Sequence, residues 1–276
     1  MSLGWGTGVL SFQPVMRGTY PVHPEPPRPD LLGRALKGYQ EGRLERGDLE
    51  RAFRRGMVEA VAEQVMAGLE MVGDGFIHWD GPIFFLLRRL KGFWTPEDAR
   101  WQRRREGGGG DERVSCARVM EKVEWTMPIL RDDYLFLSER SPVPVRVGLT
   151  GPYSIARMVD PGVYGEDIKG LTLDLAEALN HELRELEKVG AEWVIVEEPM
   201  VVDPLEDEEE FVEASCRLNE EVNLKLMVGL IGSVVGLEKV LPQTPYQGLA
   251  IDLQNVPQNE GILEEGVWWE GRILEL

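Results

Sequence analysis

The chain has 276 residues, of which 43% are hydrophobic and 28% are charged, so we expect one folded domain over residues 1–276. Asp and Glu outnumber Lys and Arg by 48 to 30, and the net charge of −18 disfavours nucleic acid and anionic membranes as partners. No apolar run is long enough to cross a bilayer, and residues 1–7 lack the basic and apolar regions of a signal peptide. We therefore expect a cytoplasmic protein.

Short apolar, β-branched runs alternate along the chain with longer amphipathic runs, which is typical of repeated βα units around a parallel sheet. Leucine and other apolar residues recur at steps of four over residues 48–71 and again over 171–189, which predicts two helices, the second ended by Gly190. The acidic run 207–210 suits the first turn of a further helix. Seven strands are predicted, at 15–20, 73–79, 143–149, 192–196, 224–231, 248–253 and 272–276.

Residues 101–113, a basic cluster followed by four glycines, interrupt this pattern. A mobile surface loop is one interpretation, and a lid over the barrel mouth is the other. No Lys-Ser or Lys-Thr follows the glycines, so the segment is not a phosphate-binding loop. The two cysteines, Cys116 and Cys216, have no metal-ligand spacing around them, and we expect both to be buried thiols.

A parallel barrel carries its active site at the carboxyl ends of the strands, so the residues that close each apolar run are the candidates. Residues 193–200, WVIVEEPM, place Glu197 and Glu198 at such an end. Because successive strand residues point to opposite sides, only one of them can point along the barrel axis. That carboxylate could bind a substrate ammonium group or act as a base, and a salt bridge to a neighbouring loop is the alternative.

His78 could act as a general acid or hydrogen-bond a substrate, or it could be an ordinary loop or core residue. Asp74 and Asp80 flank it and could hold a cationic group or cap the next helix. Trp268 and Trp269 could form a stacking platform, or pack against the barrel floor or a partner chain.

Four motifs resemble the cobalamin-independent methionine synthases in their single-barrel, archaeal-type form. They are RGTYP at 17–21, GDGFIHWD at 73–80, LTGPYSIARM at 149–158 and GAEWVIVEEPMV at 190–201, and their order and spacing agree with that family. The resemblance implies an α/β fold, a (β/α)8 TIM-type barrel shared with the uroporphyrinogen decarboxylases. The residues that it implies for substrate binding are Tyr20, Asp74, Asp80, Gly151, Pro152, Glu197 and Glu198, with Asp252 and His78 as catalytic candidates.

The resembled family uses a zinc ion, held by His, Cys, Glu and a second Cys, to activate the homocysteine thiol. The first two ligands match Val228 and Leu230 here, and neither aliphatic side chain can coordinate zinc. Asp252 alone matches a ligand, so we expect no metal site of this kind. The chain also ends near the expected seventh strand, so we expect a barrel that lacks its eighth strand. Either residues 9–12 supply an extra strand, or a homodimer or a complex with a paralogue closes the gap.

Two functions follow from the resemblance, and both remain open at the level of sequence. The first is methyl transfer from a folate or another carrier to an amino-acid thiol. The second is a non-catalytic barrel that binds a small amino acid or pterin, or that supports a catalytic paralogue. A decarboxylase-like alternative needs arginines for porphyrin carboxylates, and Arg17 and Arg157 are its candidates.

Overall fold

The structure is a computed structural model, and it describes residues 30–78, 81–96, 117–202, 204–261 and 273–275. The α-helices are α1 (Leu31–Gln40), α2 (Arg46–Met66), α3 (Gly81–Leu87), α4 (Arg131–Ser138), α5 (Pro152–Met158), α6 (Ile168–Lys188) and α7 (Glu208–Leu218). Short 3-10 helices are η1 (Gly162–Tyr164), η2 (Leu241–Gln243) and η3 (Pro257–Glu260). The strands are β1 (Val72–Gly73), β2 (Lys91–Trp94), β3 (Arg118–Glu124), β4 (Val145–Thr150), β5 (Trp193–Glu197), β6 (Lys225–Gly229), β7 (Gly248–Ala250) and β8 (Ile273–Glu275).

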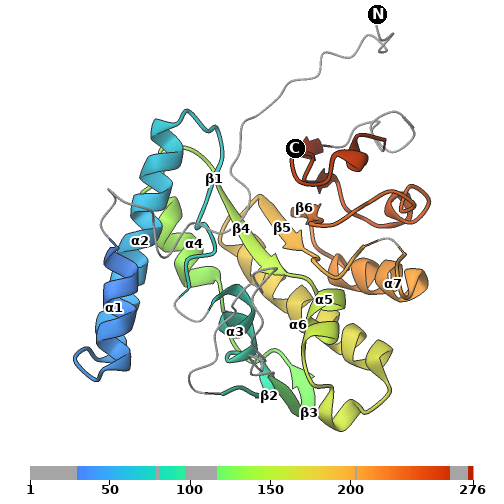
Figure 1. Cartoon of the computed structure of the whole chain (residues 1–276), viewed down its shortest axis with the longest axis horizontal. Helices are drawn as coiled ribbons and strands as arrows, with labels where there is room; N and C mark the ends of the chain where they lie inside the picture. Colours follow the sequence, from blue (N-terminus) through green and yellow to red (C-terminus); the bar gives the residue numbers. More distant parts are fainter. Residues whose placement is uncertain (1–29, 79–80, 97–116, 203, 262–272, 276) are drawn as a thin grey trace, which may run out of the picture.

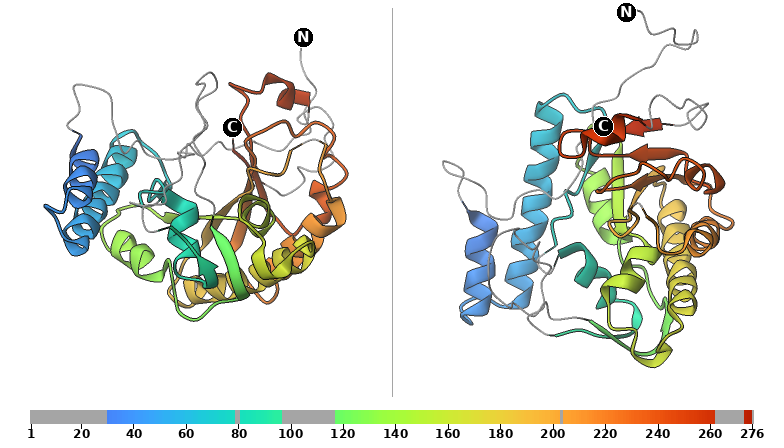
Figure 2. Two further views of the ribbon diagram at one scale, coloured as in Figure 1. Left: turned by 60° about the horizontal axis from the view of Figure 1, so that its bottom comes forward. Right: turned by 45° about the vertical axis from the view of Figure 1, so that its right-hand side comes forward.

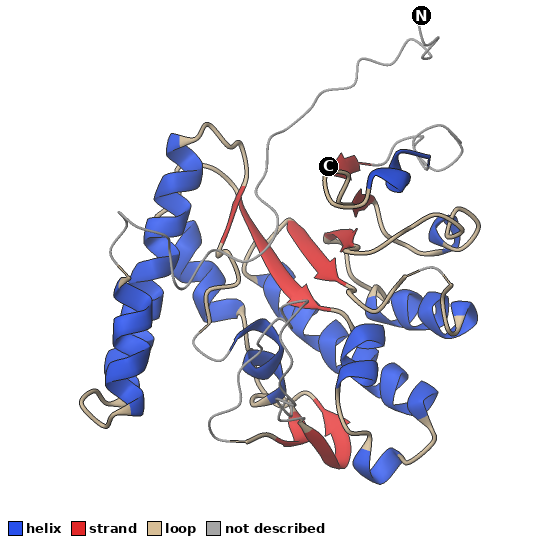
Figure 3. Ribbon diagram, viewed as in Figure 1, coloured by secondary structure: helices blue, strands red, loops and turns tan. Residues whose placement is uncertain are grey.

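Six of these strands form one parallel sheet in the order β1-β4-β5-β6-β7-β8 (Figure 1). Each strand lies beside the next one along the chain, apart from the β2–β3 hairpin inserted between β1 and β4. This stepwise order is the one by which a parallel barrel is built. Figure 2 shows the sheet as a curved layer with helices along its outer side, and Figure 3 separates the two kinds of element by colour.

The predicted helices form for the reasons that the sequence indicated. Helix α2 buries Leu49, Phe53, Met57 and Val61, the first four residues of the predicted apolar stripe. Helix α6 begins where Asp167 accepts a hydrogen bond from the Gly170 backbone N–H at 2.9 Å, and its leucine stripe is buried against the sheet. Gly190 follows α6 with a φ of 87°, a left-handed conformation that glycine adopts without strain. Helix α7 opens on the acidic run, with Asp207 as its N-cap.

The described strands depart from prediction at two places. The second predicted strand, 73–79, is wrong beyond Gly73, because Phe76 takes a φ of 53° and the chain turns there. The antiparallel hairpin of β2 and β3 was not predicted at all.

Several predictions lie outside the described residues and are not tested by the structure. They concern the first predicted strand, 15–20, the loop at 101–113, and Arg17, Cys116, Trp268 and Trp269. Cys216 is exposed, so the prediction that it is buried is wrong.

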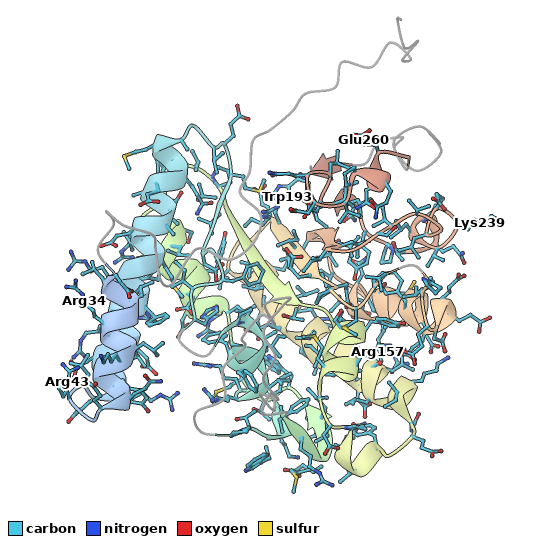
Figure 4. The ribbon with its side chains drawn as sticks, in the orientation of Figure 1. Arg34, Arg43, Arg157, Trp193, Lys239 and Glu260 are labelled. Carbon is cyan, nitrogen blue, oxygen red and sulfur yellow. The ribbon has the colours of Figure 1, made fainter. Side chains whose placement is uncertain are left out.

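Two layers of side chains lie on opposite faces of the sheet. On β5, Val194 and Val196 pack in the main core between the sheet and helices α5, α6 and α7. Trp193 and Ile195 point to the other face, where they form a smaller cluster with Met227 and Ala250. The second face is the interior of the barrel-type fold, and Figure 4 labels Trp193 at the beginning of β5. Among the described helices, none combines the length and apolar character required to span a bilayer.

Candidate functional site

A small cavity lies on the interior face where β1, β4 and β5 meet. Its volume is about 20 Å³, which is room for about one water molecule, and it is partly open to solvent. Glu197 lies at the carboxyl end of β5, Asp74 follows β1, and Arg146 comes from β4. The lining residues are Gly73, Asp74, Gly75, Phe76, Arg146, Gly148, Ile195 and Glu197. Ionic side chains of both signs therefore face one cavity at the end of the sheet where parallel α/β proteins bind ligands.

Arg146 is the functional candidate that the sequence did not indicate. Its neighbour Val147 packs in the outer core, so alternation along β4 directs Arg146 and Gly148 to the interior. The residue is only 6% exposed, and its Nη1 lies 4.0 Å from the Sδ atom of Met227. Arg146 is the second residue of β4 and does not close the strand, but its long side chain reaches the cavity.

Glycines on the interior face leave the room that two larger side chains occupy. A Cβ atom at Gly148 would overlap the ring of Phe76, and one at Gly229 would overlap the carboxylate of Glu197. Phe76 reaches this position from a left-handed backbone conformation that non-glycine residues seldom adopt. The position of Glu197 thus depends on β6 as well as on its own strand.

The Asp74 carboxylate shapes the turn after β1 while it lines the cavity. Its Oδ1 accepts a hydrogen bond from the Phe76 backbone N–H at 2.9 Å, and its Oδ2 lies 3.4 Å from Nε2 of His78. His78 is buried and stacks on Phe85 of α3 with ring centroids 3.6 Å apart. Among the described residues, the structure thus brings Asp74 and Glu197 to one cavity and places His78 against α3, away from its lining.

Glu198 has a different environment from its neighbour Glu197. It is 1% exposed, and its carboxylate accepts hydrogen bonds from the backbone N–H groups of Tyr153 and Ser154 at 3.3 and 2.8 Å. Gly151 and Pro152 form the beginning of the same helix, α5, and the Gly151 N–H donates to the Glu197 carbonyl at 2.8 Å. The predicted substrate-binding residues Gly151, Pro152 and Glu198 are thus joined in one junction between the GPYS and EEPM motifs.

Burial raises the pKa of Glu198 to about 7, although hydrogen bonds from Ser154 oppose the rise. The folded protein then keeps this proton up to a higher pH than the unfolded chain, whose glutamate has a pKa near 4.5. The free energy of unfolding should fall as pH rises between these two values, by on the order of 3 kcal/mol for this group. Urea unfolding at a series of pH values measures this dependence. The free energy of unfolding of Glu198→Gln should fall less steeply with pH than that of the unmodified protein. Equal slopes for the two proteins would contradict a raised pKa at Glu198.

The residues matched to the first two zinc ligands do not face the cavity. Val228 and Leu230 are fully buried in the outer core, and the interior positions of β6 are Met227 and Gly229. Neither of these supplies an imidazole, thiolate or carboxylate, so the donor set of β6 does not fit zinc. In the part of the chain that the structure describes, no three His, Cys, Asp or Glu side chains are grouped for a metal ion.

The remaining predicted residues lie elsewhere. Both carboxylate oxygens of Asp252 accept hydrogen bonds from Asn255, from its backbone N–H at 2.9 Å and its Nδ2 at 2.7 Å. Asp252 therefore holds the turn after β7 and is not among the residues that line the cavity. Tyr20 and Asp80 lie outside the described residues.

The curved parallel sheet, the outer helices and the polar cavity at the strand ends define an α/β protein of the parallel-barrel class. No family model matches the sequence. The chain is 29% identical to a methionine synthase of Saccharolobus solfataricus over 204 residues, which cover 73% of this chain and 59% of the relative. It is 28% identical to a methionine synthase of Sulfurisphaera tokodaii over 232 residues, 83% of this chain and 66% of the relative.

Solved structures show the same fold. A putative vitamin-B12 independent methionine synthase from Listeria monocytogenes superposes with a TM-score of 0.67 at 13% identity, over 90% of this chain and 87% of that one. A B12-independent methionine synthase from Shewanella, in complex with selenomethionine, gives 0.63 at 17% identity, over 84% and 71%. The predicted barrel-type fold and the divergent resemblance to cobalamin-independent methionine synthases are confirmed, while the chain spans less than two thirds of the length of these two curated relatives.

Proposed function

We propose that this chain binds a sulfur-containing amino acid at the carboxyl end of β5, above the small cavity of β1, β4 and β5, as a methionine synthase-like protein. The observation that carries the proposal is the carboxylate of Glu197 at the carboxyl end of β5, held over Gly229 in an otherwise small and partly apolar cavity. A carboxylate in this place is suited to an ammonium group. The names of the curated relatives, and the selenomethionine in the Shewanella structure, support an amino acid of this class.

Methyl transfer to homocysteine is the reaction that the resemblance favours. The bond between the methyl carbon and the carrier nitrogen breaks, a bond from carbon to sulfur forms, and the proton that the thiol loses ends on the carrier nitrogen. A bound zinc ion would supply the acidity of that thiol, but Met227 and Gly229 on β6 do not fit such an ion. The described residues therefore support binding and orientation of the amino acid.

The test is isothermal titration of the protein with L-homocysteine and with L-methionine. Glu197→Gln keeps the size of the side chain and removes its charge, so we expect binding to weaken at least tenfold, because a charge-assisted hydrogen bond contributes about 1.5–3 kcal/mol. Glu59→Gln, at an exposed acid on α2, is the control and should leave binding unchanged. Absence of binding to the unmodified protein, or equal affinities for Glu197→Gln, would reject the proposal.

The second candidate function is a non-catalytic binding or partner barrel, and the apolar interior positions of β6 favour it. The two functions differ in that only a methyltransferase converts homocysteine to methionine. Incubation with 5-methyltetrahydrofolate and homocysteine, with and without added zinc, should yield methionine if the chain is a methyltransferase. Binding without methionine formation would support the partner barrel.

A further inference from the structure

Helix α2 carries a glutamine on its buried side. The buried residues of the helix follow a helical spacing through Met57 and Val61, and Gln64 continues it three residues further along the chain. Gln64 is only 4% exposed, and a polar side chain in such a place is stable only if its hydrogen-bonding groups find partners. The partners therefore indicate what this glutamine does.

The amide of Gln64 finds its partners on its own helix and on strand β1. Its Nε2 donates to the Ala60 carbonyl at 3.1 Å and to the Gly73 carbonyl at 2.8 Å. Its Oε1 accepts a hydrogen bond from the Gly73 backbone N–H at 3.0 Å. Both backbone groups of Gly73 are thus bonded to one side chain, and the bond to Ala60 fixes the orientation of the amide.

Gly73 directs these two groups away from the rest of the sheet. Alternate residues of a strand direct their backbone groups to alternate sides, and Val72 bonds to β4, since its N–H donates to the Pro144 carbonyl at 3.0 Å. The groups of Gly73 therefore point to the outer edge of β1, which among the described strands lies at one end of the sheet. Because β1 consists of Val72 and Gly73 alone, Gln64 occupies the hydrogen-bonding positions that a next strand would use.

We propose that the side chain of Gln64 takes the place of the next strand and prevents the addition of a β-strand at Gly73. A sheet edge with free N–H and C=O groups pairs readily with a strand of another chain, and proteins avoid this by covering the edge. The Gln64 amide offers the same donor and acceptor as a peptide group and presents no new edge. A strand of any origin can pair with Gly73 only after Gln64 has moved away. The contact involves no ligand, so the inference is independent of the proposed function.

Amide hydrogen exchange followed by NMR, together with sedimentation velocity, tests the inference. We expect the Gly73 amide of the unmodified protein to be protected from exchange. In Gln64→Leu, which keeps the approximate volume of the side chain and removes its amide, exchange at Gly73 should be about tenfold faster at low protein concentration. As the concentration rises, this variant should form species larger than those of the unmodified protein, because its edge is open.

Gln243→Leu is the matched control. The Gln243 amide also donates to a carbonyl four residues earlier, that of Lys239 at 2.7 Å, but it is exposed and lies on η2, outside the sheet. This variant should leave exchange at Gly73 and sedimentation unchanged.

Two results would overturn the inference. One is rapid exchange at Gly73 in the unmodified protein, and the other is a Gln64→Leu protein that sediments like the unmodified protein at every concentration. If Gln64→Leu does not fold, Gln64→Ala takes its place, because alanine is the best helix former. Slow exchange at Gly73 in that variant at low concentration would overturn the inference equally.

Discussion

Gly151→Ala should destabilise the protein by roughly 3 kcal/mol or more, the largest effect that we expect from the addition of one methyl group. A Cβ atom at Gly151 would overlap the Glu198 carboxylate, which is buried and held by backbone N–H groups of α5. Neither partner can move freely, because Gly151 also donates its own N–H to the Glu197 carbonyl. Overpacking of this kind forces backbone shifts, and here it also breaks the hydrogen bonds of a buried carboxylate.

Urea unfolding of Gly151→Ala measures this loss. Gly47→Ala is the control, because a Cβ there meets only Arg51 at 3.5 Å, and alanine should stabilise helix α2 slightly. In a double-mutant cycle with Glu198→Ala, the double variant should lose less stability than the two single variants lose together. The reason is that Glu198→Ala removes the group that the new methyl meets. Strict additivity would show that the Glu198 carboxylate is not the obstacle.

Arg157→Met should cost about 3–5 kcal/mol, because it leaves the buried Glu210 without its cation. Nη1 of Arg157 on α5 lies 2.8 Å from Oε1 of Glu210 on α7, and the guanidinium lies 3.5 Å above the ring of Tyr153. Figure 4 labels Arg157 on α5, where it connects the two helices. This arginine, a candidate for porphyrin carboxylates in the decarboxylase alternative, is therefore part of a buried structural pair.

Chemical denaturation of Arg157→Met and of Arg157→Met/Glu210→Gln tests the pair. The double variant should recover part of the loss, because its glutamine carries no uncompensated charge. Lys169→Met offers a matched comparison between helices α6 and α7, since Lys169 pairs with Glu213 at 2.7 Å while both side chains are 48% and 45% exposed. Its effect should stay below about 1 kcal/mol. If Arg157→Met and Lys169→Met lower the free energy of unfolding by similar amounts, burial does not make the Arg157–Glu210 pair more important than an exposed pair.

Local patterns predicted most of the parallel sheet and its long helices. The stripe of leucines in α6 and the short apolar runs of β4, β5 and β6 are patterns of apolar residues that can be recognised within one short stretch of sequence. The hairpin of β2 and β3 has no such signal, because its pairing joins Lys91 to Glu124 across a long intervening segment. The turn at Phe76 was missed for a related reason: it depends on space that Gly148 provides from another strand.

The sequence by itself determined which chemical groups lie at the strand ends, since a carboxylate that follows an apolar run is visible in one segment. It identified Glu197 and Glu198 but did not assign their different environments, nor did it show that Arg146 reaches the same cavity. Only the tertiary structure decided that Glu198 is enclosed by α5 while Glu197 faces Gly229, and that Val228 and Leu230 belong to the outer core. The reason is physical: burial and electrostatic partners come from neighbouring strands and helices, and those neighbours are set by packing across the whole fold.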